Sequence, residues 1–276
     1  MKTIGISSLM LLFCLTSSLQ TQAQLLNKIG KKLEQKAEEL IDNNKKDSKT
    51  SSSEEPVSKS TSKQTGPFKN IAPLENDFKR GSEEIFFDDF EEDLIGKMAG
   101  RWTSNGTGTV QQVDGFEGKW LKLFDANTYK IKELVRIPEN FTIEFDLLTL
   151  SSTKSNFAID FGFDYQQGVG KHYYLADQNP VNVEASYRFN RFNFNSNEYS
   201  PKKSSEIEAN MSYFVNDVMK VKLKIEGDHM SAYINEYKVL DTEMIDPMTK
   251  KYFYFAVEND ENEAGIYIKN VRINKL

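Results

Sequence analysis

From residue 84 onward, apolar and polar residues alternate with a period of two, in short runs that turn-forming residues separate. Phe, Ile and Leu alternate with Thr, Glu and Asp over residues 141–147, and residues 157–163 repeat the pattern. Residues 221–225 do the same, and Gly227-Asp228 then turns the chain into a further alternating run. Short strands at regular intervals are typical of antiparallel sandwiches and barrels. The sequence therefore predicts an all-β domain.

The aromatic residues indicate where the core of this domain lies. Of 19 Phe, 12 Tyr and 2 Trp, only Phe13 precedes residue 68. This distribution predicts one β-rich domain rather than two. Residues 67–276 carry more Asp and Glu than Lys and Arg, whereas residues 24–66 are slightly basic. An acidic domain argues against a nucleic-acid-binding surface, because phosphate contacts need clustered Lys and Arg.

Residues 1–23 resemble a secretory signal peptide. Lys2 precedes an apolar run over residues 4–15, and small residues lead to a cleavage point after Ala23. The run is shorter than the roughly 20 apolar residues that span a bilayer. The only cysteine, Cys14, lies inside it behind a bulky Phe, unlike the small residue that precedes a lipidated cysteine. We expect an exported, thiol-free chain in the periplasm, the outer envelope or the extracellular space.

Residues 24–43 predict a short amphipathic helix. Leu26, Ile29, Leu33, Ala37 and Leu40 recur at helical spacing, and lysines form a row beside them. Basic residues come first and acidic residues last, which opposes the helix dipole and weakens an isolated helix. Two kinds of partner would stabilise it: an anionic membrane surface or a second copy of the helix. A solvated spacer is the third interpretation.

The segment that follows the helix lacks core-forming residues. Residues 44–66 are rich in Ser, Thr and Lys and contain one aliphatic residue, Val57. Such a composition predicts disorder, because too little apolar surface is available for burial. We therefore assign residues 44–80 to a disordered linker and transition, and residues 81–276 to the β-domain.

Three stretches of the domain resemble the concanavalin A-like lectin, glucanase and laminin-G family. They are Ile85–Phe90, Asn140–Asp146 and Ile266–Ile273. The runs Gly100–Thr103 and Asp114–Trp120 further resemble domains that stand before OmpA-like domains in Bacteroidota envelope proteins. The resemblance covers residues 84–276 and implies a two-sheet antiparallel jelly-roll sandwich. No OmpA-like domain follows in this sequence, so peptidoglycan anchoring is not implied.

The closing run, residues 266–273, contains a break in its alternation. The apolar phase shifts between Ile268 and Val271, which predicts a β-bulge near Lys269-Asn270. Related carbohydrate-binding jelly rolls often have an acidic residue in this strand, where this chain has Lys269. Asp88 and Asp89 are the candidate Ca²⁺ ligands, but Lys269 in place of the acidic residue argues against calcium binding. No cofactor is expected.

The polar sides of neighbouring predicted strands supply the candidate site. In this fold the concave sheet face commonly binds sugars, whose hydroxyls pair with carboxylate, amide and guanidinium groups. A solvated sheet face is the competing interpretation, since any such face is polar. We expect a glycan site formed on one face by Glu144, Asp146, Asp160, His172, Tyr174, Arg188 and Asn190.

The resembled family includes glucanases, whose catalytic motif can be compared with this sequence. Their motif is Glu-x-Asp-x-x-Glu, and retaining hydrolysis needs two carboxyl groups about 5 Å apart. Here Glu144 and Asp146 match the first two acids, but Thr149 replaces the second Glu. The sequence therefore predicts a non-catalytic glycan-binding module. Two alternatives remain: a glycoside hydrolase that pairs Glu144 with a carboxylate such as Asp160, and a structural or protein-interaction sandwich.

Overall fold

The computed structural model describes residues 66–73, 78–151, 156–169, 178–259 and 265–276. These residues belong to one compact unit within residues 62–276. The predicted signal peptide, the amphipathic helix and most of the linker lie outside the described residues, as do His172 and Tyr174. Across the described ranges, no helix is both long and apolar enough to cross a membrane.

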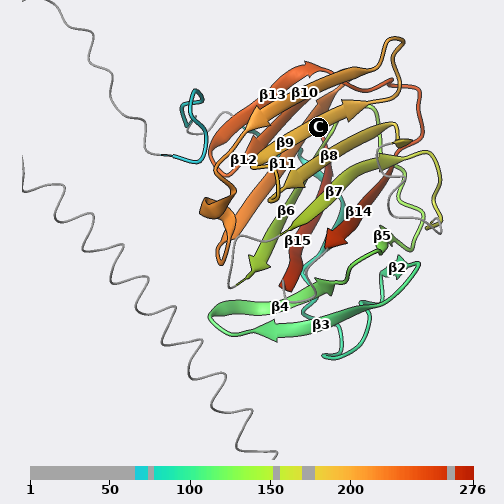
Figure 1. Ribbon diagram of the computed structural model, residues 1–276. Helices are drawn as coiled ribbons and strands as arrows, with labels where there is room; N and C mark the ends of the chain where they lie inside the picture. The colour runs from blue at the N-terminus through green and yellow to red at the C-terminus, as the bar shows by residue number, and fades with distance from the viewer. Residues whose placement is uncertain (1–65, 74–77, 152–155, 170–177, 260–264) are drawn as a thin grey trace, which may run out of the picture. The chain divides into compact units, whose positions relative to one another are not determined.

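The domain consists of two antiparallel sheets packed face to face (Figure 1). The eight-stranded sheet has the order β13-β12-β11-β6-β15-β4-β3, and β1 pairs with β15. Its strands are β1 (Glu83–Asp88), β3 (Gly108–Val113), β4 (Phe116–Leu123), β6 (Phe141–Leu150), β11 (Val218–Glu226), β12 (His229–Ile234), β13 (Tyr237–Glu243) and β15 (Gly265–Lys275).

The seven-stranded sheet has the order β10-β9-β8-β7-β14-β5-β2. Its strands are β2 (Trp102–Ser104), β5 (Thr128–Ile131), β7 (Phe157–Asp164), β8 (Val181–Ser186), β9 (Arg191–Ser196), β10 (Lys203–Glu208) and β14 (Tyr252–Asn259). A short 3-10 helix, η2 (Met211–Phe214), follows β10. The predicted all-β, two-sheet sandwich is confirmed.

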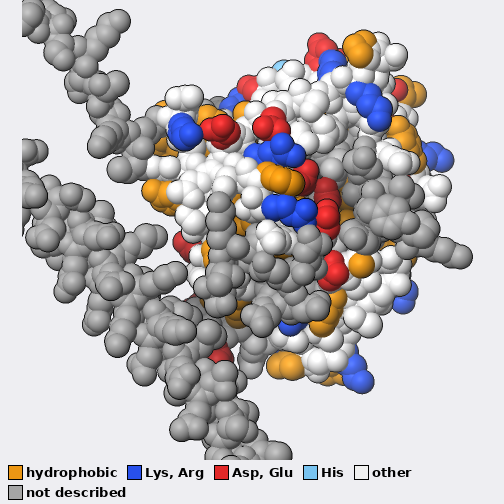
Figure 2. All heavy atoms as spheres, in the orientation of Figure 1, with side chains coloured by type: hydrophobic (Ala, Val, Ile, Leu, Met, Phe, Trp, Pro, Cys, Tyr) orange, Lys and Arg blue, Asp and Glu red, His pale blue; other side chains and the backbone are white. Residues whose placement is uncertain are grey.

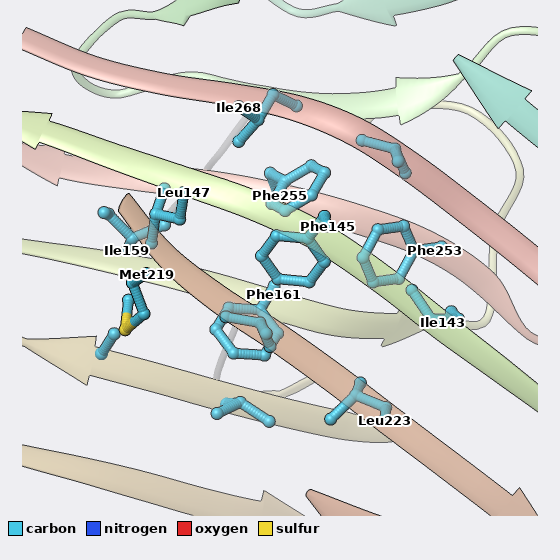
Figure 3. Packing of buried hydrophobic residues seen from close by; sticks show 14 of the residues in the cluster. Ile143, Phe145, Leu147, Ile159, Phe161, Met219, Leu223, Phe253, Phe255 and Ile268 are labelled. Atoms are coloured by element: carbon cyan, nitrogen blue, oxygen red, sulfur yellow. The ribbon is translucent and has the colours of Figure 1, made fainter. Parts of the chain in front are cut away.

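The core forms where the inward sides of the two sheets meet. Figure 3 shows Phe145 of the eight-stranded sheet among Phe161, Phe253 and Phe255 of the seven-stranded sheet. The ring centroid of Phe145 lies 5.1 Å from that of Phe161 and 4.9 Å from that of Phe255. The apolar positions of the runs 141–147, 157–163 and 221–225 are all buried. The alternation in the sequence therefore assigned these side chains to the core correctly.

The predicted bulge in the closing strand is also confirmed. The register between β15 and β6 shifts between Lys269 and Arg272. Asn270 has a φ of 55°, and its side chain donates a 2.6 Å hydrogen bond to Asp146. An extra residue in one strand leaves its side chain out of the regular alternation, which explains the slipped apolar phase.

The packed part of the chain includes residues before Gly81. Phe68 is 1% exposed, and its ring packs against Phe192, Phe214 and Tyr237. The carbonyl of Pro67 accepts a 2.8 Å hydrogen bond from the amide of Asn210. Pro67 and Phe68 are thus buried with the sandwich, ahead of the predicted domain boundary.

Candidate functional site

The outer face of the seven-stranded sheet carries amide and hydroxyl side chains over its β8–β10 half. In β9 the inward residues Phe192 and Phe194 are buried, so Asn193 and Asn195 face outward. Asn195 lies between Asn182 of β8 and Ser204 of β10 in the strand register. Ser204 Oγ donates a 2.9 Å hydrogen bond to Asn195 Oδ1. The face thereby presents a row of neutral donors and acceptors, which is the chemistry that sugar hydroxyls need.

Charged side chains surround this amide row. Glu184 of β8 lies opposite Asn193, and Arg191 of β9 pairs with Glu206 of β10 at 2.7 Å. In Figure 2, basic and acidic side chains are interspersed over the strands that Figure 1 labels β8 to β10. The interspersed signs leave this half of the face without a strong cationic patch.

Asp160 belongs to a buried hydrogen-bond chain at the centre of the same face. Tyr254 Oη donates to Asn182 Oδ1 at 2.5 Å, and Asn182 Nδ2 donates to Asp160 Oδ1 at 2.8 Å. Tyr254 is 0% and Asn182 2% exposed, although both point away from the main core. Burial makes each of these hydrogen bonds costly to lose. The chain fixes the orientation of Asp160, one of the sequence-predicted site residues.

Lys130 of β5 is also buried beneath this outer face. Its ammonium forms an ion pair with Asp164 and donates to the carbonyls of Gln166 at 2.8 Å and Gly168 at 2.7 Å. Burial lowers the pKa of Lys130, and the bond to Asp164 opposes this shift. Because the lysine binds three oxygens, it holds the segment after β7 against the sheet.

Arg188 and Asn190 lie in the turn between β8 and β9. Arg188 approaches Glu258 of β14 at 3.7 Å, and its guanidinium carbon lies 5.5 Å from the centroid of Phe189. Phe189 is 56% exposed. Asn190 adopts a left-handed φ of 53° and its carbonyl accepts the amide of Ala209. Both predicted residues thus stand at the end of the amide row, with an exposed aromatic ring between them.

Glu144 and Asp146 lie elsewhere, so the predicted grouping on one face is wrong. Both belong to β6 of the eight-stranded sheet, whereas Asp160, Arg188 and Asn190 belong to β7 and the β8–β9 turn of the other sheet. Glu144 accepts two hydrogen bonds from Arg80, one of them at 3.0 Å. Alternation distinguishes the core side of a strand from its outer side, but it does not tell which sheet a strand joins. The chain crosses between sheets after β6, which separates these residues.

The same arrangement excludes Glu144 and Asp160 as a pair of catalytic carboxyl groups. Glu144 and Asp160 lie on the outer faces of different sheets, with the core between them. Thr149 is 0% exposed and donates a 2.8 Å hydrogen bond to the carbonyl of Phe214. A glutamate at this position would point into the sandwich rather than beside Glu144. Retaining hydrolysis through carboxyl groups about 5 Å apart therefore has no basis in these residues.

The candidate Ca²⁺ ligands have other partners. Asp88 is 8% exposed and accepts hydrogen bonds from Trp102 Nε1 at 2.9 Å and the amide of Phe90 at 3.0 Å. Burial raises the pKa of Asp88, partly offset by these bonds. Lys269 donates to Glu91 at 2.9 Å. No cluster of three or more His, Cys, Asp or Glu in the described ranges is arranged to hold a metal ion.

Sequence reasoning missed the amide row itself. Asn182, Asn193, Asn195 and Ser204 were not among the predicted residues. The run Arg-Phe-Asn-Phe-Asn-Ser over residues 191–196 carries the period-two signal that would have placed both asparagines outside.

Solved structures of low sequence identity share this architecture. The VIP36 exoplasmic/lumenal domain in its Ca²⁺-bound form matches with a TM-score of 0.50 at 10% identity, over 70% of this chain and 90% of that one. The two antiparallel sheets and this match indicate the same architecture. The fold is the concanavalin A-like jelly roll.

Two further structures match with lower scores. A carbohydrate-binding module, CBM66 from Bacillus subtilis, has a TM-score of 0.43 at 16% identity, over 63% of this chain and 96% of that one. A legume lectin-like domain from Entamoeba histolytica has a TM-score of 0.47 at 10% identity, over 64% and 90%. No protein-family model matches the chain, and no curated protein matches it.

Proposed function

We propose that this chain is a non-catalytic, exported module that binds glycan on the outer face of the seven-stranded sheet. The observation that carries the proposal is the outward pair Asn193 and Asn195 of β9 with Ser204 beside it, whereas Asn182 of the same row is buried and bonded to Tyr254 and Asp160. Amides and hydroxyls both donate and accept hydrogen bonds, and sugar hydroxyls do the same. The likeness to lectin-like structures establishes the fold alone, so the ligand class is argued from these side chains.

The proposed ligand is an uncharged or weakly charged glycan. Glu184 and Glu206 flank the amide row, and the guanidinium of Arg191 is paired with Glu206. A polyanionic glycan would meet these carboxylates without a free cluster of cations. Phe189, exposed at the end of the row, offers a ring surface for the apolar face of a sugar. Asp160, Arg188 and Asn190 complete the proposed site.

A glycan array tests this proposal with the full chain. The double variant Asn193→Ala/Asn195→Ala should lose about thirtyfold in affinity, since each of the two lost hydrogen bonds contributes about 1 kcal/mol. Glu144→Gln is the matched control, because Glu144 lies on the other sheet and should leave binding unchanged. Equal loss in both variants, or no bound glycan at all, would favour the alternative of a structural or protein-interaction sandwich. Release of shortened glycans over days would contradict the non-catalytic assignment.

A further inference from the structure

The outer face of the eight-stranded sheet carries a straight row of lysines. Lys220, Lys222 and Lys224, which we call the lysine row, occupy alternate positions of β11. The residues that alternate with them face inward and are buried: Val221 and Leu223 between the lysines, and Met219 and Ile225 on either side. Alternate residues of a strand are roughly 7 Å apart, so three ammonium groups follow one line across the surface.

Neighbouring segments add cations and an aromatic ring to this row. The ring of Phe78 packs edge-on against Tyr233 of β12 at 5.5 Å, and Lys222 Nζ lies 5.3 Å from the centroid of Phe78. Lys79 and Arg80 follow directly and are exposed. Lys238 Nζ lies 5.7 Å from the ring centroid of Tyr233. Basic groups from three parts of the chain thus converge around β11.

Acidic groups lie beside these lysines: in the strand register Asp146 is opposite Lys220 and Glu144 is opposite Lys222. Arg80 binds Glu144, Lys238 binds Asp241, and Lys224 binds Glu226. Asp146 accepts a hydrogen bond from Asn270. Lys220 and Lys222 form no ion pair with a described residue. Lys220 and Lys222 therefore keep ammonium groups outside any such ion pair, although the Asp146 carboxylate opposite Lys220 is bonded only to a neutral amide and residues 67–276 as a whole are acidic.

We infer that the lysine row binds a linear anionic polysaccharide, at a site separate from the amide row. An extended chain with a carboxylate on successive sugars presents its charges along a line, as β11 presents its lysines. The half-buried ring of Phe78 beside Lys222 can contact the apolar face of a sugar whose carboxylate the lysine binds.

A membrane surface fits these observations less well. Interfacial binding needs apolar side chains that enter the lipid, besides cations. The strongly exposed large apolar side chains of the described chain come from other segments: Leu94, Ile95, Leu134, Tyr165, Phe189, Tyr213, Met248 and Leu276. None of them belongs to residues 78–80, β6, β11, β12 or β13, which make up the face around the lysine row.

Titration of the full chain with polygalacturonate, a linear polycarboxylate, tests the inference. We expect binding at low ionic strength that weakens as salt is added, because screening reduces the attraction between exposed charges. Lys220→Glu/Lys222→Glu should lower the affinity at least tenfold. The milder Lys220→Gln/Lys222→Gln should lower it less, and it keeps the test informative if the charge reversal impairs folding.

The matched control is Lys202→Glu/Lys250→Glu, which makes the same change in net charge at exposed lysines outside β11. It should bind polygalacturonate within twofold of the unmodified chain. Equal loss in control and row variants would overturn the inference, since net charge alone would then explain binding. Binding to phosphatidylglycerol vesicles but not to polygalacturonate would replace the polysaccharide with a membrane. Asn193→Ala/Asn195→Ala should bind polygalacturonate normally, so failure of the glycan proposal and failure of this one are distinguishable.

Discussion

On the outer face of the eight-stranded sheet the ion pair of β11 is exposed. The seven-stranded sheet also has exposed pairs, such as Arg191–Glu206, but it buries the pair that Lys130 forms with Asp164. Lys224 and Glu226 of β11 pair at 2.7 Å with side chains that are 24% and 58% exposed. Lys130 pairs with Asp164 on the other sheet with side chains that are 1% and 20% exposed. Solvent screens the first pair and hardly reaches the second.

This difference in exposure indicates which polar groups are suited to binding a ligand and which contribute more to stability. Exposed lysines can change partners at little cost, so the face that carries them is suited to an anionic ligand. Buried polar groups have no such freedom, because each loss of a partner leaves an unsatisfied atom. The seven-stranded face is therefore expected to be rigid around Tyr254 and Asn182 and to bind glycan mainly through the more exposed side chains of β9 and β10, with Asp160 held in place beside them.

Removing the buried lysine should have the largest effect. Lys130→Met keeps most of the apolar stem but leaves Asp164 and the carbonyls of Gln166 and Gly168 without their donor. The free energy of unfolding should fall by roughly 3 kcal/mol, as for other broken buried pairs. Denaturant unfolding monitored by tryptophan fluorescence measures this change. A loss below about 1 kcal/mol would show that solvent reaches this pair, and the contrast between the faces would disappear.

The hydroxyl of Tyr254 should have the next largest effect. Tyr254→Phe removes the 2.5 Å hydrogen bond to Asn182 while keeping the ring. We expect a loss of about 1–2 kcal/mol, because the amide oxygen of Asn182 stays buried. Tyr252→Phe, on the same side of β14 but half-buried, is the control and should change stability by less than about 0.5 kcal/mol. Equal effects of both variants would mean that the buried chain contributes nothing of its own.

The sequence was sufficient to predict several of the strands, β6, β7 and β11 among them, and their core sides. The inward residues of β6, β7 and β11 follow from alternation alone, because a strand repeats every two residues. The bulge at Lys269-Asn270 was predictable for the same reason: an extra residue shifts the phase of every residue after it.

The sequence did not predict how strands are distributed between the sheets. Glu144 and Asp160 alternate in the same way and lie only one connection apart, yet that connection crosses the sandwich. The local pattern does not show which strands pair with each other. In the structure β6 pairs with β11 and β15, whereas β7 pairs with β8 and β14. The contribution of Phe68 was missed because one apolar residue beside a polar segment has no periodicity.

Acid should destabilise the eight-stranded face through Asp241. Burial acts to raise the pKa of Asp241, but bonds from Lys238, His229 and Ser231 outweigh it and lower the pKa to about 2. A lowered pKa stabilises the fold above the unfolded value of 3.8, and this contribution is lost as the pH falls toward 2. After allowance for screening, the loss is on the order of 1 kcal/mol.

Chemical denaturation at intervals between pH 5 and pH 2 tests this prediction. The unfolding free energy of Asp241→Asn should fall less steeply than that of the unmodified chain over this window. Parallel curves would assign the acid sensitivity to other carboxylates, such as Glu91, whose pKa the bond from Lys269 lowers.

The exposed lysine of β11 should have the smallest effect on stability. Lys224→Met makes the same chemical change as Lys130→Met, and both lysines pair with one carboxylate. Glu226 remains in contact with water after the substitution, and surface pairs contribute about 0–1 kcal/mol. The unfolding free energy should therefore change by less than about 0.5 kcal/mol, measured beside Lys130→Met under identical conditions. Because the same variant removes one charge of the lysine row, it should weaken polygalacturonate binding while leaving the fold intact. A loss comparable to that of Lys130→Met would show that the two faces do not differ in how they stabilise the sandwich.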